Sequence, residues 1–250
     1  MIAAPVGFQC PECVQGAAKQ VRQPTTIAGA QLVAKPTITY ALIGITAVVF
    51  GLQMLVGVDQ VAGSFGMWPG GVAVNGEYYR LLTAAFLHGS FLHILFNMYV
   101  LFALGPTLER ILGHGRFLTL YLLAALGGSV ASYAFSDIRT LSVGASGAIF
   151  GLMGALVVAG RRLRYDITQV LGLIAVNIVI GFIAPGVDWR AHLGGLAVGA
   201  LVAVIFVHSP ARFRLAWQIG GVAAVLIALA LITSWRTDQI LALVTPVLQA

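Results

Sequence analysis

The stretch GASGAIFGLMGALVVAGRRLR, Gly144 to Arg164, combines three features that decide the fold of this chain. A serine lies between glycines at its start, an apolar run follows, and a cluster of arginines ends it. An apolar run that stops at basic residues is typical of a membrane-spanning helix with its basic end in the cytoplasm. The serine at the other end is either a packing residue or a nucleophile.

The whole chain has the composition of a membrane protein. Of its 250 residues, 59% are hydrophobic and 9% are charged, whereas a soluble domain is typically about 25% charged. The formal net charge of +6 comes from short basic clusters between apolar runs. Because no basic stripe with interleaved aromatic residues is present, nucleic acid is not an expected partner. The expected solvent is the lipid bilayer.

Seven apolar segments are expected to cross the membrane as helices, which predicts an all-α polytopic membrane protein. Two of the seven, the fourth and the fifth, are short for a hydrocarbon core about 30 Å thick and are expected to begin below its surface. The segments are residues 38–57, 91–108, 117–135, 146–160, 169–184, 191–208 and 215–234.

Basic residues predict the orientation, because cytoplasmic loops carry an excess of Lys and Arg. With the amino-terminal tail inside, ten basic residues lie in the inner connections and four in the outer ones, so the amino terminus is expected inside and the carboxyl terminus outside. The inner residues are Lys19, Arg22, Lys35, Arg110, Arg116, Arg161, Arg162, Arg164, Arg212 and Arg214, and the outer ones are Arg80, Arg139, Arg190 and Arg236.

The outer connection at residues 58–90 is too long and too apolar for a simple loop. It contains Trp68, Tyr78, Tyr79 and Phe86, which are residue types that settle at membrane interfaces. We expect a structured element that lies partly in the outer leaflet.

Polar side chains in three of the expected spans lie at one depth. His93 and Asn97 share one helix face, Ser146 opens the fourth span and His192 opens the sixth. Fifteen or sixteen residues separate these groups from the inner ends of their spans, or about 22–24 Å of helix. A single site open to the outer side requires such a shared depth. Asn177, in the fifth span, is expected to be a packing residue.

Small residues follow both Ser146 and His192 at helical spacing, and such faces let two helices approach closely in lipid. If the fourth and sixth spans pack through them, Ser146 and His192 meet at the outer end of the contact. The residues concerned are Gly147, Gly151 and Gly154 in the fourth span and Gly195 and Gly199 in the sixth.

This meeting would suit acyl-transfer chemistry. A neutral His192 can take the proton of Ser146 and make its oxygen a nucleophile. The Ser146 backbone N–H at the helix start, the Asn97 amide and the His93 ring could stabilise an oxyanion, and Gly144 would let the preceding loop bend toward Ser146. Each feature alone is more often a packing feature, and it is their combination that favours catalysis.

Cys10 and Cys13 form a C-x-x-C pair, which is half of the usual four-ligand zinc site. The nearest histidine, His88, lies in a different region, so the pair cannot complete a site alone. Three interpretations stay open: a remnant of a zinc ribbon, a redox pair, or half of an intermolecular metal site.

Taken together, these residues resemble the rhomboid family of intramembrane serine proteases. The resemblance covers about residues 38–208. The matching stretches are EYYR at 77–80, HGSFLHILFNMY at 88–99, LERILG at 108–113, GASGAIFGLMG at 144–154 and AHLGGLAVG at 191–199.

The resemblance implies a six-helix bundle whose water-filled site opens to the non-cytoplasmic side. It implies Ser146 as nucleophile and His192 as general base and acid, with an oxyanion hole of His93, Asn97 and the Ser146 backbone. Gly144 matches the supporting glycine two residues before the nucleophile. Neither a metal nor a nucleotide cofactor is implied, and no acidic third member is expected.

Two positions depart from the family pattern, and two match structural positions. Tyr79 stands where a tryptophan commonly precedes the arginine, and Phe150 where some members have a tyrosine that stacks on the histidine. His88 and Glu109 match positions that we expect to be structural. Asp188, one helical turn before His192, is expected to be an outer-loop carboxylate.

The resemblance also divides the chain. Residues 1–36 would be a cytoplasmic tail with a half zinc-ribbon-like CPEC, 37–210 the six-helix core, and 211–250 a seventh helix with a short outer tail, the "6+1" arrangement. The CPEC tail resembles the second half of a zinc ribbon found on some bacterial relatives. If it is such a half, Met1 need not be the native start. The expected location is the bacterial cell membrane.

The expected function is that of a serine endopeptidase. It would cleave transmembrane or membrane-adjacent peptide bonds of transmembrane protein substrates through a Ser-His dyad and an acyl-enzyme. The alternative is a non-catalytic, rhomboid-like binder of transmembrane clients, whose mark would be loss of the serine or the histidine. An ion-coupled transporter is disfavoured because no acidic residue lies within an expected span. The sequence does not indicate an oligomeric state.

Overall fold

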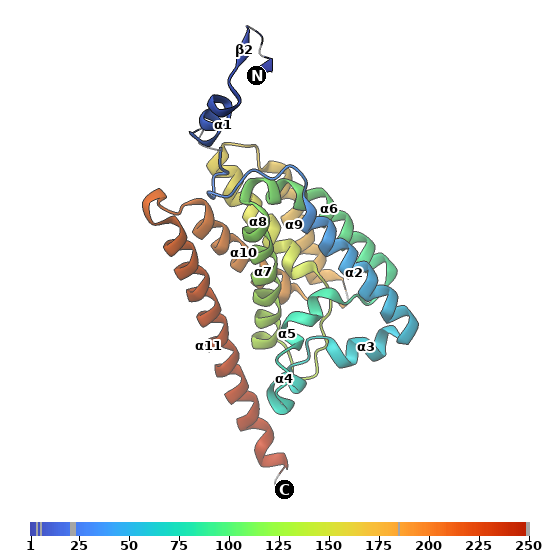
Figure 1. The fold of residues 1–250 in the computed structure, drawn as a ribbon. Coiled ribbons are helices and arrows are strands. Elements are labelled where there is room, and N and C mark those ends of the chain that lie inside the picture. Colours follow the sequence, from blue (N-terminus) through green and yellow to red (C-terminus); the bar gives the residue numbers. More distant parts are fainter. Residues whose placement is uncertain (4, 6, 21–23, 185, 249–250) are drawn as a thin grey trace.

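The computed structural model describes residues 1–248 except 4, 6, 21–23 and 185, and it is a bundle of helices (Figure 1). Arg22, one of the tail cations counted above, lies outside the described residues. The long helices are α1 (Pro11–Gln20), α2 (Thr37–Val56), α6 (Phe91–Leu112), α7 (His114–Phe135), α8 (Ser146–Leu163), α9 (Thr168–Ile183), α10 (Trp189–Val207) and α11 (Arg214–Leu248).

Short elements complete the chain. They are strands β1 (Ile2–Ala3) and β2 (Phe8–Gln9) in the tail, helices α3 (Val58–Phe65), α4 (Pro69–Asn75) and α5 (Arg80–Thr83) in the outer connection, and 3₁₀ turns η1 (Ala84–Phe86) and η2 (Ala211–Phe213). Apart from the two-residue strands, the predicted all-α class is confirmed.

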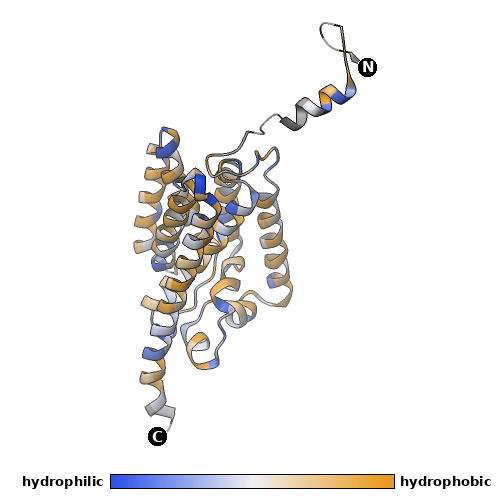
Figure 2. Cartoon of the chain, turned by 60° about the vertical axis from the view of Figure 1, so that its left-hand side comes forward, coloured by the Kyte–Doolittle hydropathy of each residue, from blue (hydrophilic) through white to orange (hydrophobic). Residues whose placement is uncertain are grey.

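The helices have the length and apolar surface of membrane spans. Within the described part of the chain, six of them are long and apolar enough to cross a bilayer, while α9 is apolar but has only 16 residues. Figure 2 shows hydrophobic residues along the outer faces of the bundle and hydrophilic ones mainly toward the helix ends. A bilayer, rather than water, can solvate such a surface.

Helices α7, α8 and α10 form the centre of the bundle, and α2, α6, α9 and α11 surround them. Small residues allow this close packing, since a Cβ at Gly195 would overlap the backbone of Gly147, and one at Gly199 would overlap that of Gly151. On the α7 side, a Cβ at Gly128 would come within 2.8 Å of the Ala191 carbonyl oxygen. The glycine faces expected to bring α8 and α10 together do pack against each other.

The outer connection folds into α3, α4, α5 and η1 and is organised by a buried arginine. Arg80 donates to Glu77 Oε2 over 2.6 Å and to the carbonyls of Gly63 and Gly66 over 2.8 and 2.9 Å. Its guanidinium also lies 5.7 Å from the Trp68 ring centroid. The structured element expected at residues 58–90 is therefore present. Arg80, which the sequence analysis treated only as an outer basic residue, holds it together.

Glu109 corrects the expectation that no acidic residue lies within a span. Helix α6 continues past residue 108 to Leu112, so Glu109 is within it and fully buried. Its carboxylate accepts from the backbone N–H groups of Ile38 and Thr39 over 2.9 and 2.8 Å, and from Thr39 Oγ1 over 2.6 Å. The two N–H groups lie in the first turn of α2 and have no acceptor within their own helix, and a negative charge is favourable at this end of a helix. The role of this carboxylate is structural, as the resemblance implied.

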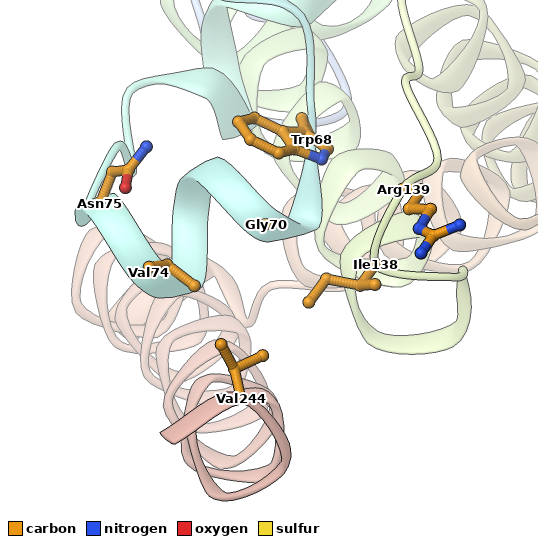
Figure 3. A pocket seen from close by; sticks show the side chains of 7 residues that line it. All are labelled: Trp68, Gly70, Val74, Asn75, Ile138, Arg139 and Val244. Atoms are coloured by element: carbon orange, nitrogen blue, oxygen red, sulfur yellow. The ribbon is translucent and has the colours of Figure 1, made fainter. Parts of the chain in front are cut away.

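Helix α11 corrects a second expectation, since it runs for 35 residues rather than ending near residue 234. The polar residues that suggested an end instead contact α7. Thr237 Oγ1 and Tyr133 Oη are 2.7 Å apart, and Arg236 donates to the Ser136 carbonyl over 3.1 Å. Beyond them, Val244 of α11 faces a cavity of about 260 Å³ beside α4, where Val74 and Ile138 also point (Figure 3).

Candidate active site

Ser146 and His192 come together where α8 and α10 begin, at one end of the contact between these helices. Ser146 is the first residue of α8, and its Oγ lies 2.9 Å from Nε2 of His192 in the first turn of α10. The Phe150 ring stacks on the His192 ring, with centroids 4.2 Å apart and planes 11° apart. The stack fixes the imidazole plane, so that Nε2 is directed at the serine oxygen.

The other nitrogen of His192, Nδ1, is buried and has no hydrogen-bond partner among the described residues. A Cβ at Gly181 of α9 would lie 3.5 Å from this nitrogen, so α9 closes that side of the ring. Asp188 does not reach it. The Asp188 carboxylate caps α10 by accepting from the Ala191 N–H over 3.3 Å, and it also accepts from Ser132 Oγ. Asp188 is thus a helix cap bonded to α7, and no ion pair joins it to Arg190 in the described part of the chain.

The loop before Ser146 is held from the outer connection. Gly144 has φ +133°, a conformation that side chains strongly disfavour. Its N–H donates to the Ala84 carbonyl over 2.9 Å. Two residues earlier, Ser142 pairs with Met67 through two backbone hydrogen bonds of 2.9 Å. The outer connection therefore sets the position of the Ser146 backbone N–H.

His93 and Asn97 of α6 lie on the same side of this loop. A Cβ at Gly144 would come within 2.8 Å of Cε1 and Nε2 of His93, so the imidazole edge faces the loop directly. The Asn97 amide donates one N–H to the His93 carbonyl over 2.8 Å and retains a second N–H. Asn177 of α9, expected to be a packing residue, makes the same kind of bond to the Leu173 carbonyl.

Sequence reasoning missed a buried clamp behind His93. Gln53 of α2 accepts from the His88 N–H over 3.0 Å and donates to the His88 carbonyl over 3.2 Å. The fully buried His88 ring meets the His93 ring edge-on, with centroids 4.9 Å apart. Gln53 thus anchors the residue that packs on His93. A glutamine amid the apolar residues of the first span was the available signal.

The cysteine pair supplies no more than two metal ligands. Cys10 and Cys13 are exposed, free thiols at the start of α1. Hydrogen bonds from the backbone of Cys13 and Glu12 lower the pKa of the Cys10 thiol. In the part of the chain that the structure describes, no third histidine, cysteine or carboxylate joins them in a cluster. Since a structural zinc needs four ligands, the pair alone does not fit one.

The sequence comparisons identify the family. The model of the Rhomboid domain matches residues 75–209, which is more than half of the chain and includes His93, Asn97, Gly144, Ser146 and His192. The chain belongs to the rhomboid family, and it is an integral membrane protein.

Two curated relatives come from Bacillus subtilis (strain 168). "Rhomboid protease GluP" is 37% identical over 193 residues, which is 74% of this chain but 38% of that protein. "Putative rhomboid protease YdcA" is 37% identical over 147 residues, 57% of this chain and 73% of that protein. "Rhomboid protease AarA" of Providencia stuartii is 29% identical over 174 residues, 58% of this chain and 62% of that protein. The chain thus spans under half of the length of the first of these relatives.

Proposed function

We propose that this chain is an intramembrane serine endopeptidase that cleaves peptide bonds of transmembrane protein substrates with a Ser146–His192 dyad. The observation that carries the proposal is the 2.9 Å separation between Ser146 Oγ and His192 Nε2, at the outer end of two membrane-embedded helices. Relatives that share over a third of the aligned residues bear the name rhomboid protease.

In the proposed reaction, His192 Nε2 takes the proton of Ser146 as its oxygen bonds to the carbonyl carbon of the substrate peptide. The tetrahedral intermediate then collapses, and the imidazolium donates that proton to the leaving amine, which leaves an acyl-enzyme ester on Ser146. Water attacks the ester with His192 again as base, and the serine regains its proton. The proton on the buried Nδ1 stays in place throughout, and the Phe150 ring and α9, rather than a carboxylate, hold the imidazole in position.

The proposed oxyanion hole consists of the Ser146 N–H, His93 and Asn97. In the described residues, the Ser146 N–H has no backbone acceptor, as expected at a helix start. The Gly89 N–H points toward His93 Nδ1 over 3.5 Å, which favours the tautomer with its proton on Nε2, the atom that faces Gly144. Such preorganised donors typically contribute about 10²–10³ in kcat each.

We further propose the 6+1 arrangement, with a core at residues 37–210 and α11 as the seventh span. Its support is that α9 crosses the bundle beside α8 and α10 although it is short. The proposed orientation, amino terminus inside and carboxyl terminus outside, is supported by the termini lying at opposite ends of the bundle (Figure 1). The dyad then opens to the non-cytoplasmic side.

The decisive experiment is cleavage of a fluorescent transmembrane substrate by the full chain reconstituted in liposomes. Ser146→Ala and His192→Ala should each abolish turnover, because each removes one partner of the dyad. His208→Ala and Ser209→Ala change the same residue types at the other end of α10 and should retain activity. Wild-type turnover in Ser146→Ala would refute the proposal.

A fluorophosphonate probe separates the protease from a client-binding member of the family. The probe needs an activated serine, so the wild type should be labelled, and Ser146→Ala and His192→Ala should not. If the folded wild type stays unlabelled while it still captures transmembrane peptides, the chain is a binder and the proposed activity is wrong.

A further inference from the structure

A groove runs between α11 and the central bundle on the side of the amino-terminal tail. It has a volume of about 550 Å³, within the range of about 300–1,000 Å³ for small-molecule sites. Its walls come from α7, α10 and one face of α11. The α11 face consists of Leu215, Ile219, Val222 and Leu226. From Leu215 to Leu226 the apolar wall extends about 16 Å into the bilayer.

Arg116 lines the tail-side end of this groove, and Arg214 directly precedes Leu215, another of its lining residues. Arg116, in the first turn of α7, donates through Nε to Gln218 Oε1 over 2.8 Å, and its terminal nitrogens have no partner among the described residues. Arg214, the first residue of α11, packs over Gly29, which follows Ala28 in the chain, and Ala28 accepts a hydrogen bond from Gln218, the partner of Arg116. Neither has a carboxylate partner within the described ranges. Two adjacent cations above an apolar wall complement a ligand with an anionic head and an apolar tail.

We propose that this groove binds an anionic phospholipid, with its phosphate between Arg116 and Arg214 and one acyl chain along the apolar face of α11. Both arginines lie at the ends of spanning helices, and such helix ends are at the level of the lipid headgroups.

The bound lipid would also fasten α11 to the tail. Arg214 packs over Gly29, a tail residue with φ +79°, while Gln218 donates to the Ala28 carbonyl over 3.1 Å. A phosphate between the two guanidinium groups offsets their positive charges at the junction of the tail, α7 and α11. Because the lipid binds the assembled groove, its binding raises the stability of that assembly.

The test is native mass spectrometry of the full chain, titrated with dioleoylphosphatidylglycerol or with dioleoylphosphatidylcholine. The wild type should bind the anionic lipid at least about tenfold more tightly. Arg116→Gln with Arg214→Gln should remove this preference, whereas Arg161→Gln with Arg162→Gln, which changes two arginines at the end of α8, should keep it. Phosphatidylglycerol should also raise the unfolding temperature of the wild type and of the Arg161→Gln, Arg162→Gln variant. It should not raise that of the Arg116→Gln, Arg214→Gln variant.

A second variant covers the case in which loss of Arg116 disturbs the fold. Ala223→Trp keeps both arginines but fills the apolar wall, so it should reduce binding of phosphatidylglycerol while the protein unfolds at its usual temperature. Three results overturn the proposal: equal affinity for the two lipids in the wild type, a preference that survives both the arginine and the tryptophan variants, or a dimer that Ala223→Trp dissociates. The last result would assign the groove to a second copy of the chain.

Discussion

The α8–α10 contact and the α11 contact represent two ways of joining helices in lipid. At α8–α10, backbone meets backbone, because Gly147, Gly151, Gly195 and Gly199 leave no side chains between the helices. Helix α11 instead contacts the bundle through side chains, both apolar ones such as Val225, Leu229 and Ile240 and polar ones such as Gln218 and Thr237. The apolar groove lies between α11 and the bundle at the tail-side end.

The difference follows from what each contact must position. Ser146 and His192, the proposed dyad, lie at the end of the α8–α10 contact where both helices begin. In the proposed protease, a shift of about 1 Å in their separation can cost about 10² in rate. No candidate site residue is on α11, so a looser contact is tolerable there. Close backbone packing is thus concentrated where the two atoms of the proposed dyad must keep their separation. Four substitutions test this contrast.

The largest effect should come from a methyl group placed in the tight contact. In Gly199→Ala the new Cβ would overlap the Gly151 backbone, which cannot move aside as a side chain would. We expect a loss of about 3 kcal/mol or more of unfolding free energy, at the upper end of overpacking costs, with loss of cleavage. Gly220→Ala on α11 meets no atom within 4 Å and should unfold like the wild type. Equal behaviour of the two in thermal unfolding would contradict the contrast.

The next effect should come from the loop beside the dyad. Gly144→Ala places a methyl group against the His93 ring at φ +133°, which would displace the Ser146 N–H. We expect roughly a 100-fold loss of kcat, comparable to the loss of one oxyanion donor, with most of the protein still folded. Gly186→Ala also has a positive φ, +78°, but no atom within 4 Å. In the liposome assay, kcat of Gly186→Ala should stay within a few-fold of the wild-type value. If Gly186→Ala instead loses as much kcat as Gly144→Ala, backbone strain alone explains the loss.

A smaller effect should follow from removal of the clamp on His88. Gln53→Leu leaves the buried N–H and carbonyl of His88 without partners, which typically costs about 1–3 kcal/mol, and it frees His93 to shift. We expect a lower unfolding temperature and about a tenfold lower kcat. Asn177→Leu is the matched control, since Asn177 bonds only within its own helix. Full activity in Gln53→Leu would show that His93 does not depend on the clamp.

The smallest effect should come from the looser contact itself. Thr237→Val removes the hydrogen bond to Tyr133 Oη and should cost about 1 kcal/mol of unfolding free energy, with turnover within twofold of the wild type. Thr245→Val, which bonds only to its own helix, should change neither quantity. A large drop in turnover for Thr237→Val would mean that α11 does help to position the dyad.

Much of this fold could be predicted because lipid imposes a simple rule on sequence. Every span must be apolar and helical, so the run that starts at Ser146 and ends at Arg161 already locates α8 within a few residues. The same rule makes a polar side chain within a span conspicuous, which is how His93, Asn97 and His192 were selected together with Ser146.

The wrong predictions concern residues whose hydrogen-bond partners lie in another segment of the chain. Helix α11 was predicted to end near residue 234, but Arg236 and Thr237 bond to α7, which extends the helix. Glu109 was placed outside the spans, although the open end of α2 allows its carboxylate to be buried. Gln53 is a polar residue within the first span, but its partner could not be predicted, because that partner is the backbone of His88 and backbone groups have no signature in sequence.

Sequence alone determined the class of protein, the positions of the spans, and the common depth of the polar residues, because hydrophobicity and helical rise are properties of a single segment. Only the tertiary structure decided which groups touch. The 2.9 Å approach of Ser146 to His192, the closing of Nδ1 by α9, the hold of the outer connection on Gly144 and the groove beside α11 each join residues far apart in the chain. Such contacts depend on how the helices pack, which the pattern of any one helix does not specify.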